Sequence, residues 1–275
     1  DGKSAFLKFG GKMIILSASD ICKSYGTEVI LENISFHINA GDRVGIVGAN
    51  GAGKSTLLNI ISGQIKADSG NCFVGKDTSI GYLRQRDNFD DKLTVIEEVN
   101  NIFTDMLAME NEIQHLNEEI AKETNPDAAK PLWNRLNALQ HEFEIKGGYT
   151  YKSEIYGVLT SMAFGEEYYN QNTGSLSGGE RTRLALACLL LRKPDILFLD
   201  EPTNHLDMIS KEVLENAIKE FKGTVIYVSH DRYFINQTAT RILNLKDNKF
   251  YNYIGNYDYY LEKKADVELR FITIT

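Results

Sequence analysis

Residues 48–56, Gly-Ala-Asn-Gly-Ala-Gly-Lys-Ser-Thr, decide the fold of this chain. They follow an apolar run at 43–47 and lead into a second apolar run at 57–61, which is the order strand, glycine-rich loop, helix. The spacing G-x-x-x-x-G-K-S is the P-loop pattern, in which backbone N–H groups turn inward to hold phosphates. Lys54 is placed to reach the β- and γ-phosphates of a nucleotide, and the Ser55 hydroxyl is placed to ligate Mg²⁺. The stretch therefore predicts an α/β domain that binds a nucleotide.

The composition is that of a globular chain of 275 residues, 43% hydrophobic and 25% charged, with a formal net charge of −8. This length buries a substantial core in one large domain or two modest ones. No apolar run is long enough to cross a bilayer, and the sequence shows no signal-peptide pattern. Cys22, Cys72 and Cys188 lack metal-ligand spacing, which indicates core thiols in a reducing compartment. The acidic balance argues against broad nucleic-acid binding.

Apolar runs and alternating patterns predict strands and helices along the rest of the chain. The expected strands are residues 13–21, 29–38, 43–47, 71–75, 79–83, 196–199, 224–229, 241–245 and 249–254. The expected helices are one that opens near residue 54 and others at 151–164, 176–191, 210–221 and 261–270.

A different pattern begins at residue 95. Apolar side chains at 95, 99, 102, 106, 109, 113, 116 and 120 are spaced alternately by four and three, as at the a and d positions of a coiled coil. Leu132, Leu136, Leu139 and Phe143 repeat this spacing after a break at 124–127. We expect a helix over 95–123, a tip near 124–131 and a second, antiparallel helix, which together form an arm of about residues 93–147. Residues 87–147 hold 14 acidic and 5 basic side chains, so this arm is a poor general RNA binder.

Polar side chains follow several of the predicted strands. Asp200 and Glu201 end a buried strand, at the sheet edge where ligands gather in α/β folds. Asp200 is placed to hold Mg²⁺, and Glu201 to polarise a water for attack on the γ-phosphate. His230 follows the next strand and can donate a hydrogen bond to charge developing on the γ-phosphate. Gln85, just after the strand at 79–83, is a candidate contact for Mg²⁺ or for the water.

Two more segments are candidates for the same site. Tyr25 lies on a short turn before the P-loop strand and can stack on a base, although a lone tyrosine there is more often a surface aromatic. Leu176-Ser177-Gly178-Gly179-Glu180 opens a helix and offers a second anion site. Most sequences of this kind are simple helix caps.

Together these motifs resemble the nucleotide-binding domain of ABC ATPases over most of residues 13–265, and they occur in that family's order. The resemblance implies a P-loop ATPase fold with an antiparallel β subdomain, a mixed or parallel α/β core and a helical subdomain that carries the arm. It implies ATP and Mg²⁺ as cofactors. The implied ATP-binding residues are Tyr25, Gly48, Asn50, Gly51, Ala52, Gly53, Lys54, Ser55 and Thr56. The implied catalytic residues are Glu201 as general base, His230 as switch histidine, Gln85 of the Q-loop and Lys54. The implied metal ligands are Ser55, Gln85 and Asp200. The signature Leu176, Ser177, Gly178, Gly179 and Glu180 is implied to serve a second site in trans, with Asp207 in the D-loop.

Three features are similar to the ABC-F branch of that family. They are the run Asn204-His205-Leu206-Asp207, the arm, and the ending at 253–264, which resembles the lead into an interdomain linker. The resemblance implies a cytoplasmic protein with two such domains that acts on the ribosome, as a translation factor or in antibiotic resistance. On this interpretation residues 1–12 are an appended segment before a natural start at Met13, 13–265 are the ATP-binding domain and 266–275 begin a linker or tail. An isolated domain of this kind is expected to bind ATP but to hydrolyse it slowly.

Two alternatives remain open. One is the ATP-binding subunit of a membrane ABC transporter, which needs a surface groove for a coupling helix in the region where the acidic arm lies. The other is a structural or DNA-organising ATPase, in which coiled-coil insertions are much longer than this one. Ribosomes, membrane subunits or chromosomal partners that co-purify from cells would separate the three.

Overall fold

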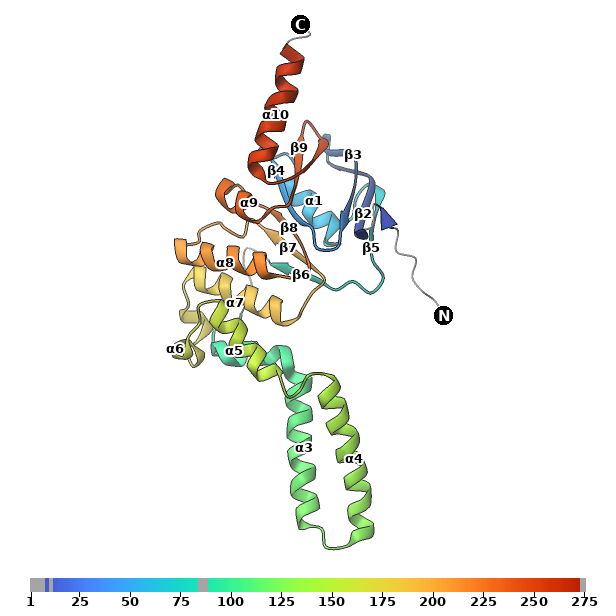
Figure 1. The fold of residues 1–275 in the computed structure, drawn as a ribbon, viewed down its shortest axis with the longest axis vertical. Helices are drawn as coiled ribbons and strands as arrows, with labels where there is room; N and C mark the ends of the chain where they lie inside the picture. The colour runs from blue at the N-terminus through green and yellow to red at the C-terminus, as the bar shows by residue number, and fades with distance from the viewer. Residues whose placement is uncertain (1–7, 10–11, 84–88, 273–275) are drawn as a thin grey trace. The chain divides into compact units, whose positions relative to one another are not determined.

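The computed structural model describes residues 8–9, 12–83 and 89–272 (Figure 1). The chain divides into two compact units, residues 1–87 with 177–275 and residues 88–176. Each unit is described by itself below.

The first unit is built on a six-stranded sheet in the order β10-β9-β4-β8-β7-β6. Its strands are β4 (Arg43–Gly48), β6 (Ile80–Leu83), β7 (Ile196–Asp200), β8 (Thr224–Val228), β9 (Arg241–Lys246) and β10 (Lys249–Ile254). All neighbours run parallel except the edge pair β9 and β10, which is antiparallel. The carboxyl ends of β4, β7 and β8 therefore meet at one edge of the sheet, where α/β folds bind their ligands.

A second sheet of the same unit is wholly antiparallel. It consists of β1 (Lys8–Phe9), β2 (Lys12–Tyr25), β3 (Glu28–Asn39) and β5 (Ser69–Val74), with β2 paired to each of the others. The structure thus confirms the expected antiparallel subdomain beside a mixed sheet.

Five helices belong to this first unit within the described residues: α1 (Lys54–Ile61), α7 (Gly178–Leu191), α8 (Met208–Glu220), α9 (Arg232–Thr238) and α10 (Tyr257–Ile272). The sequence patterns did not predict α9. Its seven residues make fewer than two turns, which is too short for a 3.6-residue period to show. The start of the helix is capped by Asp231, which accepts a hydrogen bond from the Phe234 amide at 3.1 Å.

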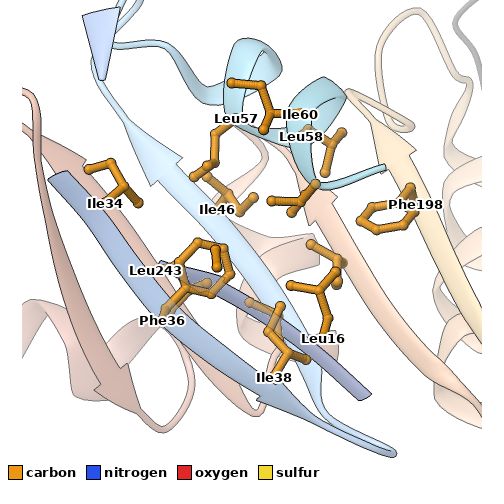
Figure 2. Close-up of a cluster of buried hydrophobic side chains, with 14 of the residues drawn as sticks. Leu16, Ile34, Phe36, Ile38, Ile46, Leu57, Leu58, Ile60, Phe198 and Leu243 are labelled. Atoms are coloured by element: carbon orange, nitrogen blue, oxygen red, sulfur yellow. The ribbon is translucent and has the colours of Figure 1, made fainter. Parts of the chain in front are cut away.

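The main core lies between the antiparallel sheet and the P-loop segment. Leu16, Ile34 and Ile38 from β2 and β3 meet Ile46 of β4 and Leu57 of α1 (Figure 2). All five side chains are fully buried or nearly so. The rings of Phe36 and Phe250 stack at 4.8 Å between centroids and join β3 to β10. This apolar contact fixes β4 and α1, and hence the loop between them.

The second unit contains the arm. Its elements are α2 (Val95–Asn100), η1 (Asn101–Phe103), α3 (Thr104–Lys122), α4 (Pro126–Ile145), α5 (Tyr151–Ser161), α6 (Glu166–Tyr169) and η2 (Thr173–Ser175). Leu116, Leu136 and Leu139 form the buried centre of a cluster between α3 and α4, with Met109, Ile113, Ile120 and Leu132 packed around it. Within the described residues, no helix of either unit is both long and apolar enough to span a membrane.

The prediction of one helix over 95–123 was wrong. A 3₁₀ turn at Asn101–Phe103 separates α2 from α3, and the ring of Phe103 packs on Tyr151 at 5.3 Å. The spacing by four and three continues across this break, so periodicity alone could not reveal it. The predicted tip at 124–131 was also too long, because α4 already starts at Pro126, a residue well suited to the first turn of a helix.

Candidate functional site

The loop between β4 and α1 has a backbone that only glycine tolerates at two points. Gly48 and Gly53 have φ angles of 156° and 90°. A Cβ atom at Gly48 would overlap the carbonyl oxygen of Leu245, and one at Gly53 would lie 2.5 Å from Cγ2 of Ile30. Gly51 also has a positive φ, of 78°, but a Cβ there would meet nothing. The loop is therefore held between β3 and β9, with Asn50 and Gly51 exposed at its crest.

Lys54 begins α1 and is buried beneath this crest. Its Nζ donates hydrogen bonds to the carbonyl oxygens of Ala49 at 2.9 Å and Gly48 at 3.2 Å. Burial lowers the pKa of Lys54, while the carboxylates of Glu201 and Asp200 act in the opposite direction. The ammonium group thus lies between the loop and two acidic side chains, where it can meet phosphate charge.

Ser55 and Asp200 bring the P-loop helix and the end of β7 together. The Ser55 hydroxyl donates to Oδ1 of Asp200 at 3.1 Å. Burial raises the pKa of Asp200, and the contacts with Ser55 and Lys54 only partly oppose this. Hydroxyl and carboxylate oxygens are the ligands that Mg²⁺ prefers, and a cation would relieve the desolvation of this carboxylate. The pair therefore fits a Mg²⁺ ion. Thr56 follows in the first turn of α1 and is half-buried.

Glu201 and His230 lie together at the ends of β7 and β8. Nε2 of His230 is 3.2 Å from Oε1 of Glu201. The other carboxylate oxygen, Oε2, is buried and has no hydrogen-bond partner among the described residues. Glu201 also has a φ of 48°, a left-handed conformation that costs a non-glycine residue free energy. Strain and an unpaired buried oxygen at one residue indicate a site shaped for a ligand rather than for stability.

A buried pair of hydroxyls joins the two loops that carry these side chains. The Oγ atoms of Thr203 and Ser229 are 3.1 Å apart, and the Asp231 amide donates to Ser229 at 3.1 Å. The Glu201 amide donates to the carbonyl of Val228 at 3.0 Å. The sequence patterns did not single out Thr203 or Ser229, although each lies within two residues of a candidate catalytic side chain.

The residues Ser177 to Glu180 form a capping box at the start of α7. The Ser177 amide donates to Glu180 at 2.7 Å, and the Glu180 amide donates to the Ser177 hydroxyl at 3.3 Å. Gly178 is exposed, with open space where a Cβ would lie. A Cβ at Gly179 would be 2.8 Å from Oδ2 of Asp207, which caps α8. The motif is thus a helix cap with an open glycine face. Leu176, in the other unit, is buried.

Two candidates remain, Tyr25 and Gln85. Among the described residues, no hydrogen bond or ion pair connects Tyr25 to this cluster. Tyr25 ends β2, is 54% exposed, and has the Lys23 ammonium 5.5 Å from its ring centre. Its exposed ring is free to stack on a flat partner. Gln85 lies outside the described residues.

Comparison with known proteins gives consistent results. The profile of the ABC transporter family matches residues 31–204. Among curated proteins, YdiF of Bacillus subtilis is 41% identical, over 92% of this chain and 39% of its own length. The energy-dependent translational throttle protein EttA of Mycobacterium tuberculosis is 34% identical, over 92% of this chain and 44% of its own. The tylosin resistance ATP-binding protein TlrC of Streptomyces fradiae is 32% identical, over 91% and 46%. The chain therefore spans less than half the length of each of these relatives.

Two solved structures share the fold. A nucleotide-free ATP-binding cassette from an ABC transporter aligns with a TM-score of 0.61 at 21% identity, over 91% of this chain and 94% of its own. A dimeric ATP-binding cassette bound to ADP and phosphate aligns with a TM-score of 0.59 at 25% identity, over 87% and 98%. The predicted ABC-type fold is confirmed.

Proposed function

The chain belongs to the ABC transporter family, whose domains are ATPases, and we propose that it is one ATP-hydrolysing domain of a two-domain ABC-F protein that acts on the ribosome in the cytoplasm. One observation supports ATP hydrolysis most directly. At one edge of the sheet the structure brings together the side chains of Lys54, Ser55, Asp200, Glu201 and His230.

The chemistry proposed for these side chains follows from their charges and contacts. Lys54 offsets charge on the β- and γ-phosphates of ATP. Ser55 and Asp200 hold Mg²⁺, which when bound shields the phosphate oxygens. Glu201 accepts a proton from the attacking water, because its Oε2 is buried without a partner among the described residues. Nε2 of His230 lies 3.2 Å from that carboxylate in this structure, and with nucleotide bound its N–H would donate to the γ-phosphate instead.

The proposed partner for hydrolysis is a second ABC domain. The exposed Gly178 at the start of α7 offers backbone N–H groups to a phosphate on another domain, as the resemblance implies. The chain covers only 39% to 46% of the length of the three relatives named above, which supports the proposal of a longer parent chain. We expect this chain alone to bind ATP and to hydrolyse it slowly. Fast turnover by a verified monomer would contradict the assignment of the signature to a second site.

Two observations support the ribosome as the proposed partner. EttA and TlrC carry names that refer to translation and to resistance against tylosin. The acidic two-helix arm lies between the P-loop and the signature, where the ABC-F resemblance implies an insertion, and this supports the proposal.

The test uses the full-length parent with Glu201→Gln and the equivalent change in its second domain, sedimented in cell lysate with and without ATP. We expect these variants to bind ATP without hydrolysing it and to migrate with ribosomes only when ATP is present. A matched parent with Lys54→Ala and the equivalent change should not migrate with ribosomes. Recovery in the membrane fraction instead would replace the ribosome with a membrane partner, the alternative raised by the sequence.

A further inference from the structure

The segment that carries His230 is tied to helix α8 by an ion pair. Nζ of Lys211 lies 2.8 Å from Oδ2 of Asp231, the residue directly after His230. Lys211 is in the first turn of α8, four residues after Asp207, which caps that helix. The side chains of Lys211 and Asp231 are 42% and 23% exposed, so the pair is partly shielded from solvent. None of the catalytic or metal-binding roles assigned above includes this lysine.

Both carboxylate oxygens of Asp231 have partners. Oδ2 accepts from the lysine, while Oδ1 accepts from the Phe234 amide at 3.1 Å and so caps α9. The amide of Asp231 donates to the Ser229 hydroxyl at 3.1 Å. The backbone on either side of His230 is therefore held by hydrogen bonds, and the lysine connects this segment to α8.

The imidazole of His230 is held less firmly than the backbone that carries it. Half of the side chain is exposed, and among the described residues its hydrogen-bonding contact is with Glu201 alone, at 3.2 Å. Its position therefore depends on the position of its backbone. Misplacement of a reacting group by about 1 Å can cost ~10²-fold in rate. The ion pair is thus placed to affect hydrolysis, although a pair this exposed contributes little to the stability of the fold.

We propose that Lys211 is a positioning residue for ATP hydrolysis, which holds the imidazole of His230 in place through Asp231. This inference rests on the proposed function and adds a residue to it. Lys211 contacts neither the nucleotide nor the attacking water, and it acts on the rate by way of His230. Loss of the lysine should therefore lower kcat and leave the KM for ATP nearly unchanged.

The first test measures ATP turnover by the full-length parent, with the second-domain counterpart of Glu201 changed to Gln so that hydrolysis reports on this domain's site. Lys211→Met removes the charge and keeps a long side chain, and Lys211→Arg restores the ion pair. Asp231→Asn breaks the same pair from the other side but keeps an oxygen that can cap α9. Lys219→Met is the matched control, because Lys219 lies on the same helix, is 39% exposed and pairs with Glu215 at 2.6 Å.

We expect Lys211→Met and Asp231→Asn each to lower kcat ~5-fold or more, with the KM for ATP within ~2-fold of wild type. The double variant should be no slower than either single variant, because both changes remove one and the same contact. Lys211→Arg should recover most of the rate, and Lys219→Met should keep all of it. The proposal is overturned if Lys211→Met keeps the wild-type kcat, if Lys219→Met lowers kcat as much, or if the losses of the two single variants multiply in the double variant.

A second measurement needs no hydrolysis. Nuclear magnetic resonance of the whole chain follows the imidazole signals of its five histidines, and the signal that is missing from His230→Gln belongs to His230. Lys211→Met should shift that signal and Lys219→Met should not, while the signals of His115 and His141 on the arm should stay in place in both. An unmoved His230 signal in Lys211→Met would overturn the positioning role. A parent that hydrolyses no ATP would contradict the proposed function, and the His230 signal would then decide the role of Lys211 by itself.

Discussion

The left-handed backbone of Glu201 predicts that glycine is more stable than alanine at this position, the reverse of the usual order of these two residues. At a φ of 48° an L-residue loses about 1–2 kcal/mol relative to glycine. Glycine, however, costs about 0.4–1 kcal/mol relative to alanine through the entropy of the unfolded chain. Alanine and glycine remove the same carboxylate and the same contact with His230. We therefore expect Glu201→Gly to be more stable than Glu201→Ala by about 0.5–1 kcal/mol.

The assay is urea unfolding of both variants followed by circular dichroism, with the free energy of unfolding taken from the midpoint and slope. Glu212 provides the matched control, because it is an exposed glutamate inside helix α8. There the order should invert, with Glu212→Ala more stable than Glu212→Gly by about 1 kcal/mol. Equal or greater stability of Glu201→Ala over Glu201→Gly would refute the view that strain is stored at this position.

Three further predictions concern stability. Gly157 lies inside α5 with open space at its Cβ, so Gly157→Ala should raise the free energy of unfolding of the helical unit by about 0.5–1 kcal/mol in urea melts. Hydrogen bonds from the Ser210 amide and hydroxyl lower the pKa of Asp207, so its charge stabilises the fold above the unfolded value of 3.8 and ceases to do so as pH falls through the lower folded pKa. Asp207→Asn, which keeps the cap, should therefore be less stable than wild type near pH 6 and approach it in acid, whereas Asp207→Ala, which also loses the cap, should stay about 1 kcal/mol less stable than wild type in acid and fall further behind near pH 6. Leu139→Ala should destabilise the arm by about 2–4 kcal/mol, and the fluorescence of Trp133, the only tryptophan, should then change at a lower urea concentration than the circular dichroism of the whole chain.

Local patterns were enough to predict most of the fold. The P-loop, the buried strand that ends at Asp200 and the capping sequence at Ser177 each depend on neighbours in the chain, so their structure follows from short-range rules. The arm shows the limit of such patterns. Apolar residues at heptad spacing predict a helix whether or not it is continuous. At the break, Phe103 packs on Tyr151, a residue that lies far along the sequence and outside any local pattern.

The contact between the side chains of Thr203 and Ser229 could not be predicted from local sequence patterns either. It exists because β7 and β8 are parallel neighbours with Asp200 opposite Val228, and no pattern within either strand states that pairing. Sequence reasoning could place Glu201 and His230 at the ends of their strands. It could not predict that buried hydroxyls join the two loops behind them.

The position of Asn244 in the sheet is the feature that local sequence patterns predict least well. In the run Arg-Ile-Leu-Asn-Leu-Lys at 241–246, an asparagine between leucines is compatible with a solvent-facing position on an edge strand. The register excludes this, because Asn244 lies opposite Val47 on one side and Tyr251 on the other, so β9 is an interior strand. Helices α9 and α10 then cover the face to which the side chain belongs, and a cavity is the space they leave. The position of Asn244 beside this cavity of about 520 Å³ thus follows from strand register and helix packing, and the residues next to it in the sequence do not reveal it.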